Sequence, residues 1–374
     1  MSSYFIIDNP GGQGKLKITI EPYIEEIALK KSNKLYIFNW PSYLGGADTR
    51  IAHTIKILSK FMDITVIPNA SQLLQQKHWT SFLDGYGCKY TTMEKLGDSL
   101  DGYALSMCND FFFKNGIAKK AKEKGLKVVW SSEMMWHHQG ELDAIKEGVV
   151  DTVLYTSETQ KSALKANYDK NKTKELKEFV IDNFIDHYDF PLIERNNKTE
   201  NITIGRVSRS DPLKYPENFP LFYTNLNLKN PKYAVMGWDK NLEDKFRWFN
   251  FDGNWKLYTS ASKKVINLLE EIDIFVYPLG HRFRESWGRS TAEAMLSGCP
   301  VVVPSGDHHF INFIQHGKTG FIYKTYEECR QICQFLEQNP NTRKEVGIAA
   351  RNYLIQNIFN IEEHTKKWKE VFNA

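Results

Sequence analysis

Glu285 and Glu293 lie at the two ends of the segment Glu-Ser-Trp-Gly-Arg-Ser-Thr-Ala-Glu, which carries the clearest chemical signal of the chain. The apolar run over 272–278 predicts a buried strand before it, and the pattern over 290–297 predicts a short helix, ended by Gly298. Carboxylates accept hydrogen bonds from hydroxyl groups, and eight residues of helical rise span roughly 12 Å. We therefore expect the two glutamates to hold hydroxyl groups at opposite ends of one ligand.

The turn between the glutamates is expected to bind an anion. The backbone N–H groups of Trp287, Gly288 and Arg289, next to Ser286, sit where the helix begins. A helix start offers unpaired donors and a partial positive charge, so a phosphate fits between the two carboxylates. The ordinary alternative is that two glutamates at this spacing share an exposed helix face and are only solvated.

An alternation of strand and helix patterns supplies the scaffold for these residues. The N-terminal half of the series comprises the strands 34–40, 64–68, 103–107, 127–132 and 151–156, with helices over 49–61, near 116–124 and from Glu158. The C-terminal half comprises the strands 201–206, 232–237, 272–277 and 301–303. Such an alternation predicts an α/β protein with two doubly wound domains and mainly parallel sheets.

A polar segment divides this series, and its composition suits a linker. We expect the following parts: a Rossmann-like N-terminal domain over 1–187 with an extension over 1–33, a linker over 188–201, a C-terminal domain over 202–355, and a last helical segment over 356–374. In the extension, residues 11–15 lack the spacing of a phosphate-binding P-loop and predict a β-turn before a strand from Leu16 to Ile20.

Further motifs follow the helix, namely Gly298-Cys-Pro-Val-Val-Val303 and His316-Gly-Lys-Thr-Gly320-Phe. Together with the Glu-x7-Glu segment, they closely resemble the donor-binding half of retaining GT-B glycosyltransferases, in particular glycosyltransferase family four. The resemblance covers nearly the whole chain from about Lys34 onward. It implies two Rossmann-like domains with an active-site cleft between them, a nucleotide-sugar donor on the C-terminal domain, the acceptor on the N-terminal domain, and a C-terminal helix that crosses back. Glu285 would then position the sugar hydroxyls, and Glu293 the ribose.

Three basic residues follow the first strand of the second domain, in Gly-Arg206-Val-Ser-Arg209-Ser-Asp-Pro-Leu-Lys214. This segment resembles the phosphate clamp of the family, in which an arginine and a lysine neutralise the diphosphate and the charge that develops on the leaving group. We expect Arg206 to be the arginine of the clamp. The spacing departs from the usual form, so either Arg209 or Lys214 is its partner, and exposed loop charges are the alternative.

The N-terminal side of the cleft is expected to contribute a glycine loop and a histidine. Gly45 and Gly46 lie between the first strand and the first helix, where missing Cβ atoms let a substrate approach the backbone. A plain turn is the alternative. His137 or His138 follows the strand 127–132 at its carboxyl end, where the resemblance places a catalytic histidine against the transferred sugar, and an ordinary surface histidine is the other interpretation.

No cofactor and no metal ion are expected. GT-A enzymes hold a divalent ion with an Asp-x-Asp motif, and this motif is absent from the sequence. The basic clamp and the helix start would have to replace the ion. We therefore expect metal-independent transfer from a nucleoside-diphosphate sugar, most commonly a UDP- or GDP-sugar in similar enzymes.

Composition favours a cytoplasmic protein. The five cysteines are scattered, no apolar window approaches the length of a membrane span, and the N-terminus lacks a signal-peptide pattern. The net charge of +4 is too small to establish a nucleic-acid or membrane partner. Basic stretches over 119–124 and 161–177 are either solvated helix faces or contacts with an anionic acceptor or the inner membrane surface.

The acceptor stays open at this point. A glycan or a lipid-linked glycan is the default that the family implies. A second hypothesis is a hydroxymethylated pyrimidine in DNA, as in bacteriophage DNA glycosyltransferases of GT-B fold. Two rival classes are a nucleotide-sugar epimerase, which shares the GT-B architecture, and a sugar-binding module without catalysis, although the Glu-x7-Glu context favours transfer.

Overall fold

The chain folds into two α/β domains, each built on a parallel sheet. The computed structural model describes residues 3–8, 15–20, 33–42, 46–173, 175–195 and 198–373. In order across the sheet, the seven strands of the N-terminal domain are β5 (Lys89–Tyr90), β4 (Met62–Val66), β3 (Asn33–Ile37), β6 (Tyr103–Met107), β7 (Lys127–Ser132), β8 (Thr152–Tyr155) and β9 (Lys177–Val180). All neighbouring strands in this sheet run parallel.

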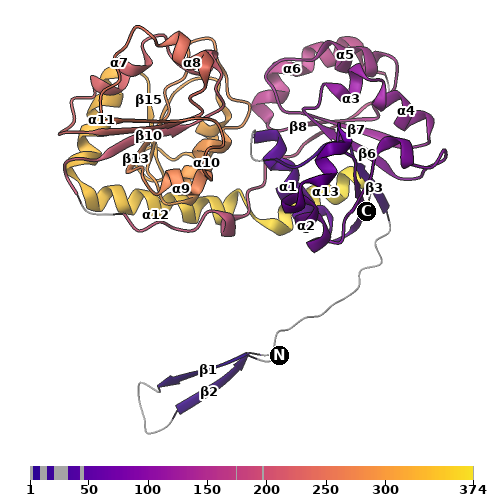
Figure 1. The fold of residues 1–374 in the computed structure, drawn as a ribbon, viewed down its shortest axis with the longest axis horizontal. Coiled ribbons are helices and arrows are strands. Elements are labelled where there is room, and N and C mark those ends of the chain that lie inside the picture. Colours follow the sequence, from indigo (N-terminus) through magenta and orange to yellow (C-terminus); the bar gives the residue numbers. More distant parts are fainter. Residues whose placement is uncertain are drawn as a thin grey trace.

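Helices cover both faces of this sheet, as Figure 1 shows for α1 and α2 on one side and α3, α5 and α6 on the other. They are α1 (Gly46–Leu58), α2 (Lys77–Gly85), α3 (Phe111–Lys114), α4 (Ile117–Glu123), α5 (Gln139–Lys146) and α6 (Glu158–Asn171), with the 3-10 turns η1 (Ser71–Gln75), η2 (Met93–Lys95) and η3 (His187–Asp189). Helix α1 forms because its apolar residues recur at helical spacing, and Ile51, Ile55 and Leu58 are at most 1% exposed.

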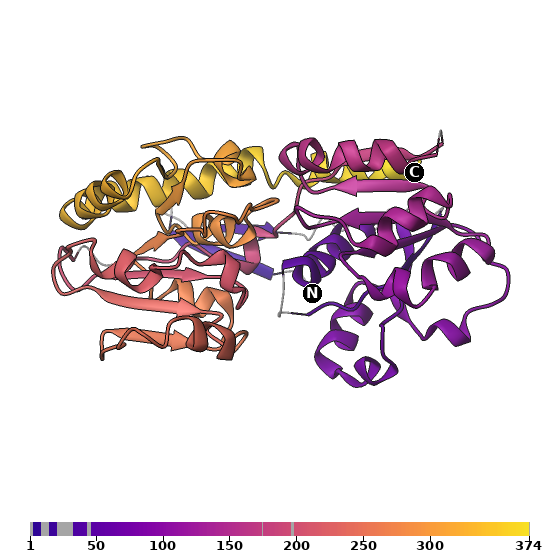
Figure 2. The ribbon, with the colours of Figure 1, turned by 90° about the horizontal axis from the view of Figure 1, so that it is seen from above.

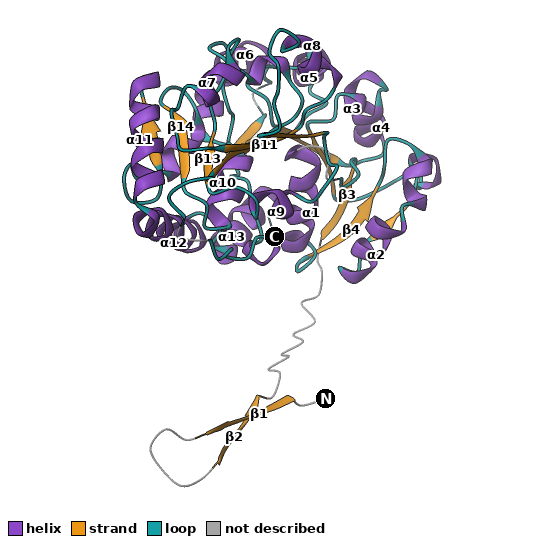
Figure 3. Cartoon of the chain, turned by 60° about the vertical axis from the view of Figure 1, so that its left-hand side comes forward, coloured by secondary structure: helices purple, strands orange, loops and turns teal. Residues whose placement is uncertain are grey.

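The C-terminal domain repeats this plan with six parallel strands, flanked by helices (Figure 3). In sheet order these strands are β12 (Trp255–Tyr258), β11 (Lys232–Met236), β10 (Thr203–Val207), β13 (Ile274–Val276), β14 (Val301–Pro304) and β15 (Phe321–Tyr323). The helices are α7 (Phe219–Thr224), α8 (Lys240–Lys245), α9 (Val265–Leu269), α10 (Arg289–Leu296), α11 (Tyr326–Gln338) and α12 (Pro340–Asn357), with the turns η4 (Pro212–Lys214) and η5 (His309–Phe313).

The last helix, α13 (Ile361–Phe372), leaves the C-terminal domain and packs beside α1 of the N-terminal domain (Figure 2). The hydroxyl of Tyr103 donates to the carbonyl of Phe372 at 2.8 Å. Trp368 and Phe372 are at most 1% exposed. The end of the chain is thus part of the core of the first domain.

The expected fold is confirmed: both domains are doubly wound around parallel sheets. The segment expected to be a linker is packed rather than free, because the guanidinium of Arg195 donates to the carbonyls of Ser297 at 2.8 Å and Ile272 at 3.0 Å. In the extension, β1 (Ser3–Asp8) pairs antiparallel with β2 (Lys15–Ile20). The expected turn before β2 lies outside the described residues.

Candidate active site

The loops at the carboxyl ends of β7 and β13 meet between the two domains. The Oγ of Ser286 donates to the carbonyl of Glu133 at 2.8 Å, and the Oγ of Ser157 donates to the carbonyl of Ser286 at 2.6 Å. Nearby, Nη2 of Arg209 lies 3.9 Å from Sδ of Met134. Sheets of this kind bind ligands beyond the carboxyl ends of their strands, so this junction is the candidate site.

Glu285 is a buried carboxylate with two close donors. Nζ of Lys214 lies 2.6 Å from its Oε1, and the hydroxyl of Tyr277 donates to the same oxygen at 2.8 Å. Burial would raise the pKa of the Glu285 carboxyl, but Lys214 and Tyr277 outweigh burial and hold that pKa below its ordinary value. Glu285 is therefore a fixed negative charge at neutral pH.

The backbone of Glu285 is held by the loop after β14. Its N–H donates to Nδ1 of His308 at 3.2 Å, and its carbonyl accepts from the N–H of His309 at 3.2 Å. Burial lowers the pKa of His308, although the charge of Glu285 opposes this shift. The lowered pKa keeps the ring neutral, so Nδ1 can accept the hydrogen bond. This loop thus orients the carboxylate rather than acting on a ligand itself.

Helix α10 starts beside this carboxylate, with Gly288 as its N-cap in the left-handed region at φ 96°. A Cβ at Gly288 would lie 2.7 Å from Cδ1 of Phe310, so only glycine fits there. The side chain of Trp287 is 2% exposed and belongs to the core, which leaves its backbone for a ligand. The helix begins only at Arg289, so the helical rise applies only to the four steps from Arg289 to Glu293 and not to the segment from Glu285 to Arg289.

Arg289 and Glu293 form a second buried ion pair, one helical turn apart. Nε of Arg289 donates to Oε1 of Glu293 at 2.8 Å, and their side chains are 9% and 7% exposed. Burial raises the pKa of Glu293, against the effect of Arg289. Burial also lowers the pKa of Arg289, and the charge of Glu293 opposes this shift.

Across the junction, a Cβ at Gly46 would lie 3.8 Å from Cδ of Arg289, while Gly45 lies outside the described residues.

The side chain of Arg206 is enclosed within the C-terminal domain, and its expected contact with a phosphate stays a prediction. It is 0% exposed, its Cζ lies 4.0 Å from the ring centroid of Tyr215 and 4.4 Å from that of Tyr277, and Nη1 donates to the carbonyl of Pro278 at 2.6 Å. Both faces of the β10 strand are covered, so a side chain on either face is enclosed in the domain. Arg209, three residues later, is exposed at the junction.

Neither candidate histidine faces the C-terminal domain. The ring of His137 packs 4.4 Å from that of Tyr168, and Nδ1 of His138 lies 3.4 Å from Oδ1 of Asp110. Within the described residues, no hydrogen bond, ion pair or ring contact joins either histidine to the C-terminal domain. From this loop, Glu133 and Met134 make the interdomain contacts instead.

Three residues of the junction were not predicted from the sequence, namely Arg50, Glu133 and Ser157. Nη1 of Arg50 forms an ion pair with Oε1 of Glu133, and their side chains are 1% and 8% exposed. Glu133 directly follows a predicted strand, and this position at the carboxyl end of a strand could have marked it as a site residue. Arg50 precedes Ile51 on the buried side of α1, so the helical periodicity of that segment also marked it as buried.

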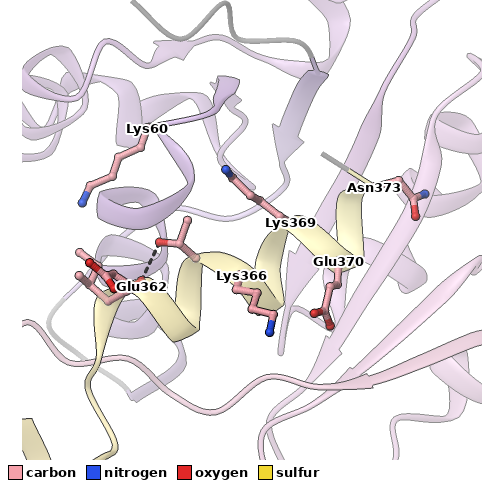
Figure 4. A pocket seen from close by; sticks show the side chains of 8 residues that line it. Lys60, Glu362, Lys366, Lys369, Glu370 and Asn373 are labelled. Atoms are coloured by element: carbon pink, nitrogen blue, oxygen red, sulfur yellow. Dashed lines mark hydrogen bonds between the residues drawn. The ribbon is translucent and has the colours of Figure 1, made fainter. Parts of the chain in front are cut away.

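Two surface hollows lie outside the Glu285–Glu293 segment. The larger, of about 870 Å³, is lined by α13 and Lys60 and mixes lysines with glutamates (Figure 4). The other, of about 530 Å³, lies among α6, β9 and α13 and includes His309. Neither is lined by a residue predicted to bind the donor, and the described part of the chain contains no group of three or more His, Cys, Asp or Glu side chains arranged to hold a metal ion.

Comparisons with known proteins find matches among glycosyltransferases. Residues 191–353 match the model of the family "Glycosyl transferases group 1". An uncharacterized glycosyltransferase of Methanocaldococcus jannaschii is 23% identical over 394 aligned residues, which cover 96% of this chain and 94% of that protein. The matched family region contains Arg206, Arg209, Lys214 and the whole Glu-x7-Glu segment.

Solved structures show the same fold. HepE of Anabaena, in complex with UDP and glucose, superposes with a TM-score of 0.69 at 14% identity and covers 91% of this chain and 99% of its own. Sucrose-phosphate synthase of Thermosynechococcus elongatus gives a TM-score of 0.66 at 11% identity, with 91% and 98% covered. The chain therefore has the GT-B fold.

Proposed function

We propose that this chain is a retaining glycosyltransferase that moves a sugar from a nucleoside-diphosphate sugar to an acceptor hydroxyl. The observation that carries the proposal is the pair of buried carboxyl side chains, Glu285 and Glu293, on either side of the α10 start at the interdomain junction. Each has its own cation, Lys214 or Arg289, at 2.6 Å and 2.8 Å. The family match over 191–353 supports the same reaction class.

The donor diphosphate lies, in this proposal, against the first turn of α10. The backbone N–H groups of Gly288 and Arg289 and the exposed guanidinium of Arg209 bind its oxygens. Lys214, held by Glu285, adds positive charge next to the leaving group. Glu285 orients the sugar hydroxyls, and Glu293 the ribose.

Retention of the anomeric configuration follows from front-face transfer in the family that the sequence resembles. Oε1 of Glu285 is already bound by Lys214 and Tyr277. We propose that this carboxylate positions the sugar and forms no covalent intermediate, and that the leaving diphosphate helps to deprotonate the acceptor hydroxyl.

A panel of nucleotide-sugars tests this function. The purified protein is incubated with UDP- and GDP-sugars, with and without glycan acceptors, and the products are separated. Release of UDP or GDP supports transfer or hydrolysis, and an α-linked product from an α-linked donor supports retention. A new nucleotide-sugar without release of the diphosphate would instead identify an epimerase.

UDP-sugars come first in this panel, because HepE was solved with UDP and, separately, with UDP-glucose. We propose a glycan or lipid-linked glycan as acceptor, with peripheral contact to an anionic membrane. Among the described residues, no helix combines the length and the apolar content that crossing a bilayer requires. Binding to anionic vesicles supports this acceptor, whereas duplex DNA binding that falls steeply with salt would favour a DNA acceptor.

Transfer is proposed to need no metal ion, because Lys214, Arg209 and the α10 start supply the positive charge. Activity in EDTA should therefore equal activity in the untreated enzyme. Loss of all activity in EDTA and its return with manganese would contradict this part of the proposal.

A further inference from the structure

Arg289 carries hydrogen-bonding capacity that the protein itself does not use. Its Nε donates to Glu293, but Nη1 and Nη2 have no hydrogen-bond partner among the described residues, although the side chain is only 9% exposed. Buried polar groups are nearly always paired, since an unpaired one costs about 1–3 kcal/mol and a charged one more. The two free nitrogens therefore indicate a missing partner.

The groups around Nη1 and Nη2 of Arg289 favour an anion as the missing partner. Arg289 is the first residue of the eight-residue helix α10, and among the described residues the N–H groups of Arg289 and Ser290 have no backbone partner and carry partial positive charge. Helix α1 begins at Gly46, whose Cβ position is 3.8 Å from Cδ of Arg289, so the positive ends of two helices meet here. The nearest carboxylate, Glu293, is already engaged at Nε.

Arg50 adds to this positive field from the N-terminal side. It acts on Arg289 as a like charge, yet its own guanidinium is committed to Glu133 and to the carbonyl of Ile181 at 2.6 Å. Of the two arginines, Arg289 is therefore the one whose Nη1 and Nη2 groups can both donate hydrogen bonds to a ligand. Such a fork fits two oxygens of a phosphate or carboxylate group.

We propose that the guanidinium of Arg289 binds the diphosphate of the donor through Nη1 and Nη2 while Nε keeps Glu293 in place. This inference rests on the proposed function and assigns to the side chain a role beyond the backbone contact expected from the motif. One residue then contacts the phosphates and fixes the carboxylate that receives the ribose.

Calorimetric titration of the full chain tests this role. The ligands are uridine, UDP, guanosine, GDP and inorganic pyrophosphate, and the variants are Arg289→Gln and, as a matched control, Arg330→Gln at a half-buried position of α11. Arg289→Gln should weaken UDP or GDP binding about 10- to 100-fold, the range of a charge-assisted hydrogen bond, and weaken nucleoside binding by a smaller factor, because Glu293 also loses its partner. Arg330→Gln should change neither.

Two outcomes would overturn the inference while the proposed function stands. One is unchanged affinity of Arg289→Gln for the diphosphates that the wild type binds. The other is an equal loss for nucleoside and diphosphate, which would mean that Arg289 acts only through Glu293 or the fold. If Arg289→Gln does not fold, Arg289→Lys takes its place, with the same selective loss expected and the same two outcomes against it.

The proposed function fails separately from this inference. If the wild type binds none of the nucleosides or nucleotides but binds pyrophosphate in a manner that Arg289→Gln abolishes, the anion site stands and the donor assignment falls. If it binds neither nucleotides nor pyrophosphate, both fall.

Discussion

Arg206 and Arg209 show how two arginines three residues apart serve different purposes. The guanidinium of Arg206 is enclosed by the rings of Tyr215 and Tyr277 and has carbonyl partners, whereas Arg209 is exposed beside Met134 of the other domain. Arg206 thus fixes the end of β10, and Arg209 is the arginine that we propose to contact the donor.

Substitution should separate these two roles. Arg206→Lys is expected to lower the free energy of unfolding by roughly 2–4 kcal/mol, because an ammonium cannot reproduce the planar donor set between two rings. Arg209→Gln should leave stability within about 0.5 kcal/mol and weaken UDP or GDP binding about tenfold. Urea unfolding and calorimetry measure the two quantities. A stable Arg206→Lys that loses diphosphate affinity would reverse the assignment.

The sequence identified these residues as a basic set and left open whether Arg209 or Lys214 is the partner of Arg206. Both faces of β10 are covered, so every residue from Thr203 to Val207 is buried, whereas Arg209 lies beyond the end of the strand and is exposed. The ion pairs of Glu285 with Lys214 and of Arg50 with Glu133 join residues far apart in the chain. Only the tertiary fold shows which charges are paired.

Helix α10 depends on its N-cap glycine. Gly288→Ala should destabilise the protein by about 3 kcal/mol, since alanine in the left-handed region is strained and its Cβ would overlap Phe310. The first turn should shift, and diphosphate affinity should fall with it. Thermal unfolding and calorimetry check both effects. Gly253→Ala is the matched control, because a Cβ there meets nothing within 4 Å; equal effects at both glycines would contradict the argument.

Helix α13 carries a pH-sensitive contact in His364, which is 3% exposed with Nε2 donating to the carbonyl of Ile358 at 2.9 Å. Burial lowers the pKa of His364 to about 4, while the unfolded chain keeps about 6.5. Between these values only the unfolded state binds the proton. Stability is therefore full above pH about 6.5 and falls by roughly 3 kcal/mol as the pH drops through 4.

His364→Gln should remove this contribution, because glutamine keeps a donor for the carbonyl of Ile358 but does not titrate. Urea unfolding at several pH values between 4 and 7 measures the slope. His281→Gln is the control, since His281 is exposed. If the slope of His364→Gln equals that of the wild type, other groups account for the acid sensitivity.

At the level of elements, central strands were predictable and edge strands were not. The expected positions of β6 and β7 agree with the structure residue for residue, because each is a continuous buried run. β9, β12 and β15 have four residues or fewer and include exposed or half-buried positions, so their sequences carry no clear period. Their place in the sheets is set by neighbouring strands.

At the scale of the whole molecule, the hydroxyl of Ser157 has two roles. It accepts from the N–H of Gln160 at 3.0 Å as the N-cap of α6, and it donates to the carbonyl of Ser286 across the domains at 2.6 Å. Neither role was predicted from the sequence. The bond to Ser286 joins the two domains, so it exists only in the tertiary fold.

Ser157→Ala and Ser157→Asp should separate capping from domain closure. Aspartate still caps α6 but has no hydrogen to donate, and its charge repels the carbonyl of Ser286. Both variants should raise the radius of gyration in X-ray scattering and weaken donor binding, whereas only Ser157→Ala should also lose the N-cap of α6, which is worth about 1 kcal/mol. Thr325, the N-cap of α11, gives the control, because Thr325→Ala and Thr325→Asp change capping alone. An unchanged radius of gyration in Ser157→Asp would show that this bond does not hold the domains together.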